Sequence, residues 1–263
     1  MLGIYLIVGA FAGTASGLLG IGGGIIVVPA LEAIFATSIF IPPSYVMHMA
    51  IGTSLAIMVF TTLSGSYAYL KRGSIRWPMI KQLLPYLLIG AIVGVLIANF
   101  LPSRFLRIIF AVFLMLISLH MLIGHHSHRD AKRIPQSIVS WIAVFIGALT
   151  SILGAGGGAM QVPFLLRLQL EIREALGTSL VCSIFTSLVA ASCFMLTGLI
   201  TPEKIAWSTG YIYWPAWVGI TIASVLFAPF GVALAHKLPT PLLKRIFAAF
   251  LLLIALDMFI FSR

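Results

Sequence analysis

Six long apolar runs constrain this chain more than any other feature. Each is long enough to cross the roughly 30 Å hydrocarbon core of a bilayer, which takes about 20 helical residues. The runs cover approximately residues 46–70, 79–101, 105–123, 175–200, 211–238 and 242–261. Only 8% of the residues are charged, whereas a soluble domain carries about 25%. The sequence therefore predicts an all-α polytopic membrane protein surrounded by the lipid bilayer.

The charged residues lie almost entirely between these runs. Sixteen Lys and Arg residues stand against six acids. Nucleic-acid binding would need a basic stripe with nearby aromatic residues on a soluble face, and the sequence has no such stripe. We therefore interpret the basic excess as a marker of membrane topology and expect no nucleic-acid partner.

Neither the start of the chain nor its cysteines indicate processing or cross-linking. The first apolar stretch begins at Leu2 with no basic residue before it, so it lacks the positive region of a cleavable signal peptide. We expect it to belong to the mature fold. Cys182 and Cys193 are eleven positions apart in one predicted helix, about 16 Å along its axis. They cannot pair with each other without breaking that helix.

Two further apolar regions are each interrupted by three consecutive glycines, at Gly22–Gly24 and at Gly156–Gly158. The flanking residues match too, at an offset of 134 positions (154 − 20). The matched pairs are Gly20 with Gly154 and Pro29 with Pro163. A continuous helix through three glycines is disfavoured, because glycine has high backbone entropy and leaves its amides exposed. The chain thus contains an internal repeat with a helix break in each copy.

The repeat extends well beyond the glycines. Gly52-Thr53-Ser54-Leu55 matches Gly177-Thr178-Ser179-Leu180, and Leu101-Pro102-Ser103 matches Leu238-Pro239-Thr240. We therefore predict an N-terminal transmembrane repeat over residues 1–123 and a C-terminal one over residues 137–263. The polar stretch 124–136 between them is the predicted linker.

The glycine breaks allow two topologies. Interrupted crossings would give eight spans and parallel halves, with the basic residues divided nine against seven between the two sides. Re-entrant hairpins would give three further crossings per half and place all but four of the sixteen on one side. Those four are Arg104, Arg107, Lys204 and Arg263. Because basic residues concentrate on the cytoplasmic side, the twelve-to-four division favours two inverted repeats with both termini outside.

The paired glycine triplets, each followed by Pro and later by Gly-Thr-Ser, resemble the sulfite exporter TauE/SafE family over nearly the whole chain. The resemblance implies a multi-pass permease of the prokaryotic inner membrane that exports sulfite, sulfoacetate or a related organosulfur anion. The second copy departs from the first at two positions, with Ser151 in place of Gly17 and Gln161 in place of Val27. These departures leave the identity of the anion open.

Inverted-repeat transporters commonly bind substrate near the bilayer midplane, where broken helices point their positive N-terminal ends at an anion. Here the half-helices are predicted to begin at about Ile25 and Ala159, with unpaired amides at their starts. Nearby hydroxyls and one side-chain amide would supplement them. The expected anion-binding residues are Ser16, Gly22, Gly23, Gly24, Ile25, Thr53, Ser54, Thr150, Gly156, Gly157, Gly158, Ala159, Gln161, Thr178 and Ser179.

Each of these assignments has a structural alternative. A Ser or Thr within a helix more often bonds a carbonyl of its own helix. Glycines at helical spacing also allow close helix packing, and we expect that role for Gly9, Gly13, Gly17, Gly90 and Gly94.

Other chemistry-bearing residues indicate no enzyme. The predicted membrane core has neither a pair of acids nor a histidine cluster, and neither glycine run continues as a phosphate-binding loop. We interpret His125, His126 and His128 as part of a solvated loop and expect no metal or cofactor. Roles for His48, Asp257 and Cys182 stay open, as do the coupling ion and the choice between monomer and homo-oligomer. The competing functions are a passive anion channel and an uptake permease for thiosulfate or another oxyanion.

Overall fold

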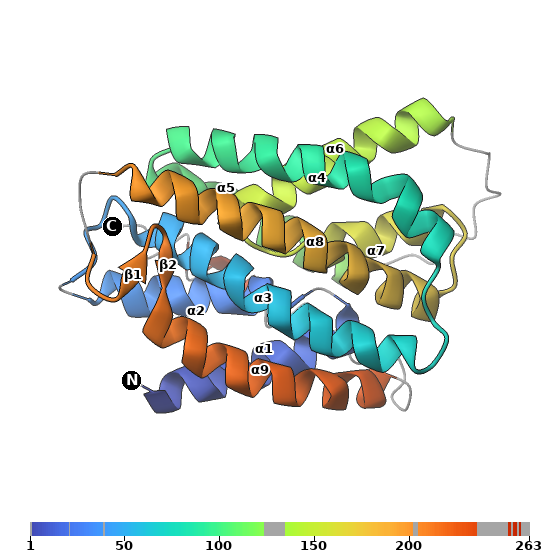
Figure 1. Cartoon of the computed structure of the whole chain (residues 1–263), viewed down its shortest axis with the longest axis horizontal. Helices are drawn as coiled ribbons and strands as arrows, with labels where there is room; N and C mark the ends of the chain where they lie inside the picture. The colour runs from blue at the N-terminus through green and yellow to red at the C-terminus, as the bar shows by residue number, and fades with distance from the viewer. Residues whose placement is uncertain are drawn as a thin grey trace.

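The computed structural model describes residues 2–20, 22–38, 40–123, 135–201, 205–235 and five positions between 252 and 258. Its helices lie roughly along one axis of the molecule (Figure 1). They are α1 (Leu2–Leu19), α2 (Gly24–Ala36), α3 (Val46–Leu70), α4 (Trp77–Phe100), α5 (Ser103–Ile123), α6 (Gln136–Leu153), α7 (Gly158–Arg167), α8 (Ile172–Leu199) and α9 (Trp214–Ala235). Two short strands, β1 (Ser208–Thr209) and β2 (Ile212–Tyr213), pair antiparallel between α8 and α9.

Six helices in this part of the chain are long and apolar enough to cross a membrane: α1, α3, α4, α6, α8 and α9. Helices α3, α4, α5 and α8 occupy the apolar runs predicted at 46–70, 79–101, 105–123 and 175–200. The run predicted at 211–238 starts later, because Tyr211 lies in the turn before β2 and α9 begins at Trp214. Most of the predicted run 242–261, together with Asp257 and the histidines of the linker, falls outside the described residues.

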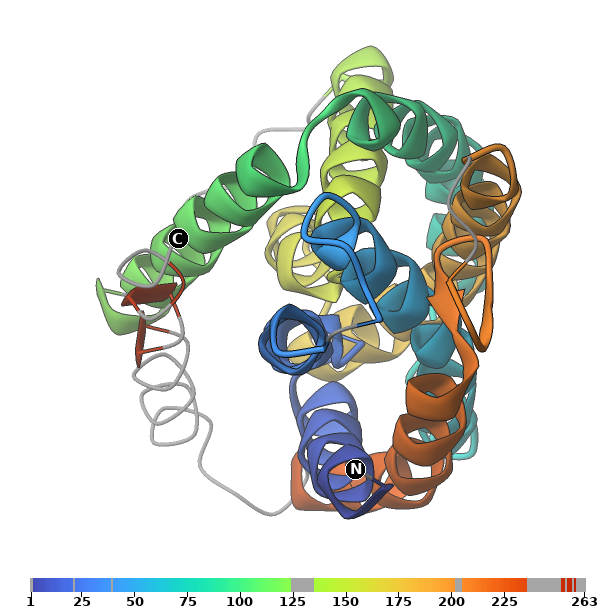
Figure 2. The same cartoon turned by 90° about the vertical axis from the view of Figure 1, so that its left-hand side faces the viewer.

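Helix α3 is the central helix. Of its most apolar stretch, 83% is buried inside the protein, compared with 39–50% for the other five candidate spans. Seen from the end that carries the N-terminus, α2 and α3 lie inside the other helices (Figure 2). The remaining candidate spans therefore keep a large apolar surface for lipid, whereas α3 is surrounded by protein.

Helices α1 and α2 form a hairpin with the first glycine break at its tip. Successive glycines of α1 touch the backbone of successive turns of α9, so the two helices run parallel; the pairs are Gly9 with Ile220, Gly13 with Ser224 and Gly17 with Ala228. Helix α2 then brings Phe35 back to Tyr213, just before α9 begins, with ring centroids 5.4 Å apart. Both arms therefore have their outer ends at the end of the molecule where α1 begins (Figure 1).

Helices α6 and α7 form a second hairpin, which enters from the other end. Helix α6 runs parallel to α4, because Gly90 touches Val144 and Gly94 touches Ala148. The residues that follow α7, Leu168 to Leu170, line a pocket together with Arg76 at the start of α4. Because α3 crosses from the α1 end to the loop before α4, the tips of the two hairpins approach each other from opposite ends.

The helix contacts of the two hairpins correspond position by position. Gly13 of α1 packs on Ser224 of α9, and its counterpart Gly147 of α6 packs on Leu87 of α4. A β-carbon at Gly13 would lie 2.6 Å from the Ser224 Cα, and one at Gly147 would lie 3.0 Å from the Leu87 Cα. These distances leave no room for a side chain. The structure thus confirms the packing role expected of Gly9, Gly13, Gly17, Gly90 and Gly94.

This packing makes Gly13→Ala destabilising, even though alanine favours a helix. We expect a loss of about 1–3 kcal/mol, because the methyl group would press on the α9 backbone rather than on a movable side chain. The matched control is Gly3→Ala in the same helix, where a β-carbon would have nothing within 4 Å. Thermal unfolding of the purified protein in detergent should show a lowered midpoint for Gly13→Ala only. Equal midpoints for the two variants would contradict close α1–α9 packing.

Candidate functional site

The glycine breaks are left-handed turns that side chains rarely tolerate. Gly20, Gly22 and Gly23 have φ angles of 65°, 79° and 82°, and Gly154, Gly156 and Gly157 have 62°, 67° and 73°. An L-residue in this region is strained, so these glycines fix the point at which each helix stops. Helices α2 and α7 then begin directly afterwards, at Gly24 and Gly158.

The two turns touch each other at the centre of the molecule. A β-carbon on Gly24 would lie 3.0 Å from the Ala155 Cα, and one on Gly22 would lie 3.4 Å from the carbonyl oxygen of Gly156. All four residues are buried. The starts of α2 and α7, with Ile25 and Ala159 in their first turns, therefore approach one another from opposite directions. Some of the first-turn amides are already bonded to the turns, since Ile26 donates to the Gly23 carbonyl oxygen and Met160 donates to that of Gly157, both at 3.0 Å. Each helix start carries about half a positive charge.

The serines of the Gly-Thr-Ser motifs hold the turns from the opposite half of the chain. Ser54 Oγ on α3 donates to the carbonyl oxygen of Gly154 at 3.1 Å. Ser179 Oγ on α8 lies 3.1 Å from the carbonyl oxygen of Gly20 and 2.9 Å from that of Leu176 in its own helix, so its proton is shared between these two acceptors. Both serines are fully buried. Each half of the chain thus satisfies a turn carbonyl that belongs to the other half.

The threonines and glycines of the same motifs dock the loops that precede α9 and α4. Thr53 Oγ1 accepts a hydrogen bond from the Tyr213 amide at 2.9 Å, and Thr178 Oγ1 accepts one from the Arg76 amide at 3.0 Å. Each of these amides directly precedes the Trp-Pro pair that opens a helix. Gly52 makes room for this contact, since a β-carbon there would lie 2.7 Å from the Tyr211 carbonyl oxygen.

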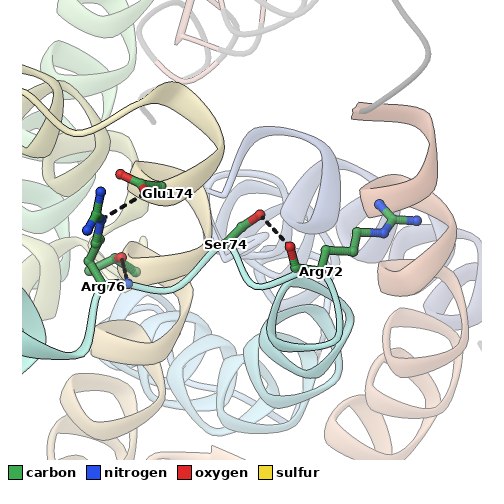
Figure 3. Close-up of polar contacts among 5 residues, drawn as sticks. Arg72, Ser74, Arg76 and Glu174 are labelled. Atoms are coloured by element: carbon green, nitrogen blue, oxygen red, sulfur yellow. Dashed lines mark hydrogen bonds and ion pairs between the residues drawn. The ribbon is translucent and has the colours of Figure 1, made fainter.

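An exposed ion pair supports the second of these docking contacts. Arg76 Nε donates to a carboxylate oxygen of Glu174 at the start of α8, 2.8 Å away (Figure 3). This hydrogen bond, together with the charge of Glu174, raises the pKa of Arg76. The Arg76 side chain is 61% exposed, so the pair contributes little stability. Its role is to align the loop between α3 and α4 with α8.

Beside the meeting point lies a buried side chain without a partner. Gln161 is 3% exposed, and neither its amide nitrogen nor its amide oxygen is hydrogen-bonded within the described part of the chain. Its side chain folds back over the second turn, with Cδ 2.8 Å from where a β-carbon on Gly157 would stand. Leaving a buried polar group unpaired costs about 1–3 kcal/mol. Such a residue is typical of a site that is completed by a ligand.

Sequence reasoning missed three residues of this centre: Met58, Ser183 and Ser187. Ser183 Oγ donates to the carbonyl oxygen of Gly156. Ser187 Oγ is fully buried and has no partner among the described residues. The spacing of Ser179, Ser183 and Ser187 places them on one helix face, a signal that could have identified them. Met58 stands four residues after Ser54, but a methionine in an apolar run gives no such signal.

The other predicted residues lie as follows. Ser16 is fully buried, with its hydroxyl unpaired in the described structure, whereas Thr150 donates to the carbonyl oxygen of Gly147 in its own helix at 3.0 Å. His48 links α3 to α4 and α5, with Nε2 3.2 Å from the Ala98 carbonyl oxygen and Nδ1 3.3 Å from Ser103 Oγ. Cys182 is buried.

The sequence as a whole matches the family described as "Sulfite exporter TauE/SafE" over residues 5–258. The chain belongs to this family. It is 32% identical to a "Probable membrane transporter protein" of Haemophilus influenzae, over 98% of this chain and 97% of the relative. A probable membrane transporter protein of Methanocaldococcus jannaschii is 30% identical, over 87% of this chain and 82% of the relative. No solved structure matches the chain.

Membership of the TauE/SafE family agrees with the helices of the structure. The protein is a multi-pass membrane transporter, in agreement with the six membrane-capable helices found among the described residues. The resemblance inferred from the paired glycine triplets is confirmed, and so is the location in the cell membrane. The glycine turns, which carried that resemblance, are the point at which the two hairpins meet.

If Ser54 and Ser179, which bond a turn carbonyl of the opposite half, have a structural role, removing one of these hydroxyls should destabilise the protein even without an anion. Ser54→Ala leaves the buried Gly154 carbonyl unpaired, which we expect to cost about 1–3 kcal/mol and several degrees in the unfolding midpoint. Ser66→Ala is the matched control, because Ser66 is buried in the same helix and, among the described residues, its hydroxyl bonds only its own helix, at Leu63. An unchanged midpoint for Ser54→Ala in sulfite-free detergent would contradict a structural role for this hydrogen bond.

Proposed function

We propose that this TauE/SafE transporter is a secondary transporter that exports a small sulfur-containing anion such as sulfite, sulfoacetate or a related organosulfur anion. In this proposal the anion binds between the starts of α2 and α7. The observation that carries it is Gln161, a buried and unpaired amide that lies against the glycine turn at the start of α7. Ser187, also buried and unpaired in the described structure, supplies a second donor.

The positive potential at this site comes from the backbone. Among the described residues, none of the nearest neighbours of the glycine turns is Lys or Arg. Two helix starts approaching from opposite directions place about half a positive charge each near the anion, and the exclusion of water strengthens their effect. A site without a charged side chain also favours release, because no buried ion pair has to be broken at each turnover.

The proposed architecture is two inverted repeats, residues 1–123 and 137–263, joined by a cytoplasmic linker at 124–136. Each repeat has a re-entrant hairpin followed by three membrane crossings. Two observations support this arrangement. The hairpins enter the described structure from opposite ends, and the packing of Gly13 on Ser224 recurs as that of Gly147 on Leu87. The division of basic residues, twelve against four, orients the linker toward the cytoplasm.

Burial of the site favours a transporter over the alternative of a passive anion channel. Gly22 to Gly24 and Gly154 to Gly158 are buried and in contact with each other. A continuously conducting pore would need an open path at this point. An alternating-access transporter instead passes through states in which the site is closed.

The sharpest test of the site is Gln161→Leu, which removes the side-chain amide, both its nitrogen and its oxygen, at nearly constant volume. We expect sulfite binding and sulfite efflux from proteoliposomes to be lost. We also expect the unfolding midpoint to stay the same or rise, because the variant no longer buries an unpaired amide. Substituting Gly157 would be a weaker test, since its positive φ strains any side chain whatever its role.

A matched control for this test is Gln82→Leu. Gln82 is exposed at the start of α4 and pairs with Gln136, away from the glycine turns. That variant should bind and export sulfite normally. Normal sulfite transport by Gln161→Leu would refute the proposed site, whatever the control does.

The topology predicts opposite labelling of two single cysteines. In a background without Cys182 and Cys193, Ser127→Cys in the linker should react only after the cytoplasmic side is made accessible. Ser262→Cys should react with a membrane-impermeant thiol reagent on intact cells. Reaction of both positions from the same side would exclude inverted repeats and support eight crossings.

A further inference from the structure

Met58 occupies the point where the two glycine turns meet. It is the middle residue of α3 and is fully buried. Its sulfur would lie 2.7 Å from a β-carbon on Gly24 and 2.7 Å from one on Gly156, and its methyl group lies against Gly22. The thioether therefore fills the space that the missing glycine side chains leave between the hairpin tips.

The two sides of the meeting point differ in chemistry. Ser183, Ser187 and Gln161 present polar groups from α8 and α7. From α3, Met58 presents only a thioether. Thr62, one helical turn further along this face, donates its hydroxyl back to the Met58 carbonyl oxygen at 2.6 Å. An oxyanion that contacts Gln161 and both helix starts would have to occupy the volume that the Met58 side chain now fills.

Methionine is suited to leaving and returning to such a position. Its side chain is unbranched, with three rotatable bonds, and its sulfur is only a weak hydrogen-bond acceptor. It can therefore change rotamer without moving α3, whose backbone bonds stay intact. A β-branched residue at this place would be held by its own helix.

We propose that Met58 closes the anion site of this transporter. Its thioether fills the site when no anion is bound and swings aside to admit one. The inference rests on the anion site proposed above, and adds to it the residue that controls entry. In this role Met58 lies on the path of the substrate, although the Met58 side chain donates no hydrogen bond to the anion.

The test uses a reporter cysteine in the closed site. Ser187→Cys, in a background of Cys182→Ala and Cys193→Ala, places a thiol where Ser187 is now fully buried. The probe is sulfonatoethyl methanethiosulfonate, a small sulfonate that reacts with thiols, applied to the full-length protein in proteoliposomes without sulfite. Met58→Ala should raise the modification rate about tenfold, because removing the thioether shifts the population toward an open site.

Two further variants separate closure from general packing. Met49→Ala removes an equally buried methionine from the same helix and should leave the modification rate unchanged. Met58→Leu keeps the volume nearly constant, so it should fold, but it loses one rotatable bond and should slow both modification and sulfite efflux. If Met58→Ala does not fold, Met58→Leu alone decides: wild-type rates of modification and efflux would overturn the inference.

The outcomes also separate this inference from the proposed function. In one outcome, Gln161→Leu abolishes sulfite binding, but the reporter cysteine at position 187 is modified no faster with Met58→Ala than with Met49→Ala. The site then stands and Met58 does not close it. If Gln161→Leu binds sulfite normally, the site itself is misplaced and the inference about Met58 fails with it. Faster modification in Met58→Ala combined with loss of binding in Gln161→Leu would support both.

Discussion

The backbone contact between the two glycine turns is the constraint on which the rest of the structure depends. A broken helix inside a bilayer exposes carbonyl groups that have no water to bond. Here the turn carbonyls of Gly20 and Gly154 accept hydrogen bonds from Ser179 and Ser54, and that of Gly156 accepts one from Ser183. The central helices α3 and α8 are thus needed to make broken helices tolerable. Their buried serines make the meeting of two helix starts compatible with the membrane interior.

Much of this architecture could be predicted from the sequence, because it depends on local rules. Apolar runs locate membrane helices, and three consecutive glycines break one. The structure departs from the prediction where a run is apolar but not helical. Tyr211 to Tyr213 continue the apolar pattern, yet they form part of a two-stranded hairpin that begins after Trp207 and turns at Gly210, both with positive φ. Apolar composition does not distinguish this turn from the helix that follows.

The candidate site was predicted less completely, for a different reason. The recurrence of Thr53-Ser54 as Thr178-Ser179 marks these hydroxyls as important, but a repeated hydroxyl does not reveal what it bonds. The structure provides each of them with a backbone partner, and their contact with an anion stays a prediction. Gln161 stood out in the sequence because its counterpart is Val27. Met58 gave no signal, since only the folded chain brings it against both glycine turns.

The close packing restricts how alternating access can proceed in this protein. Gly9, Gly13 and Gly17 touch the backbone of α9, so α1 cannot slide along α9 without a clash. Helix α6 is held to α4 in the same way. Each hairpin is therefore tied to a helix of the other half of the sequence, and the rigid groups are α1 with α9 and α4 with α6 rather than the two sequence halves.

Relative motion between these groups costs less at the serine hydrogen bonds, since each such bond contributes only about 0.5–1.5 kcal/mol. The glycine turns lie between these groups, so a motion that separates α2 from α7 would open the space beside Gln161 without disturbing the helix pairs.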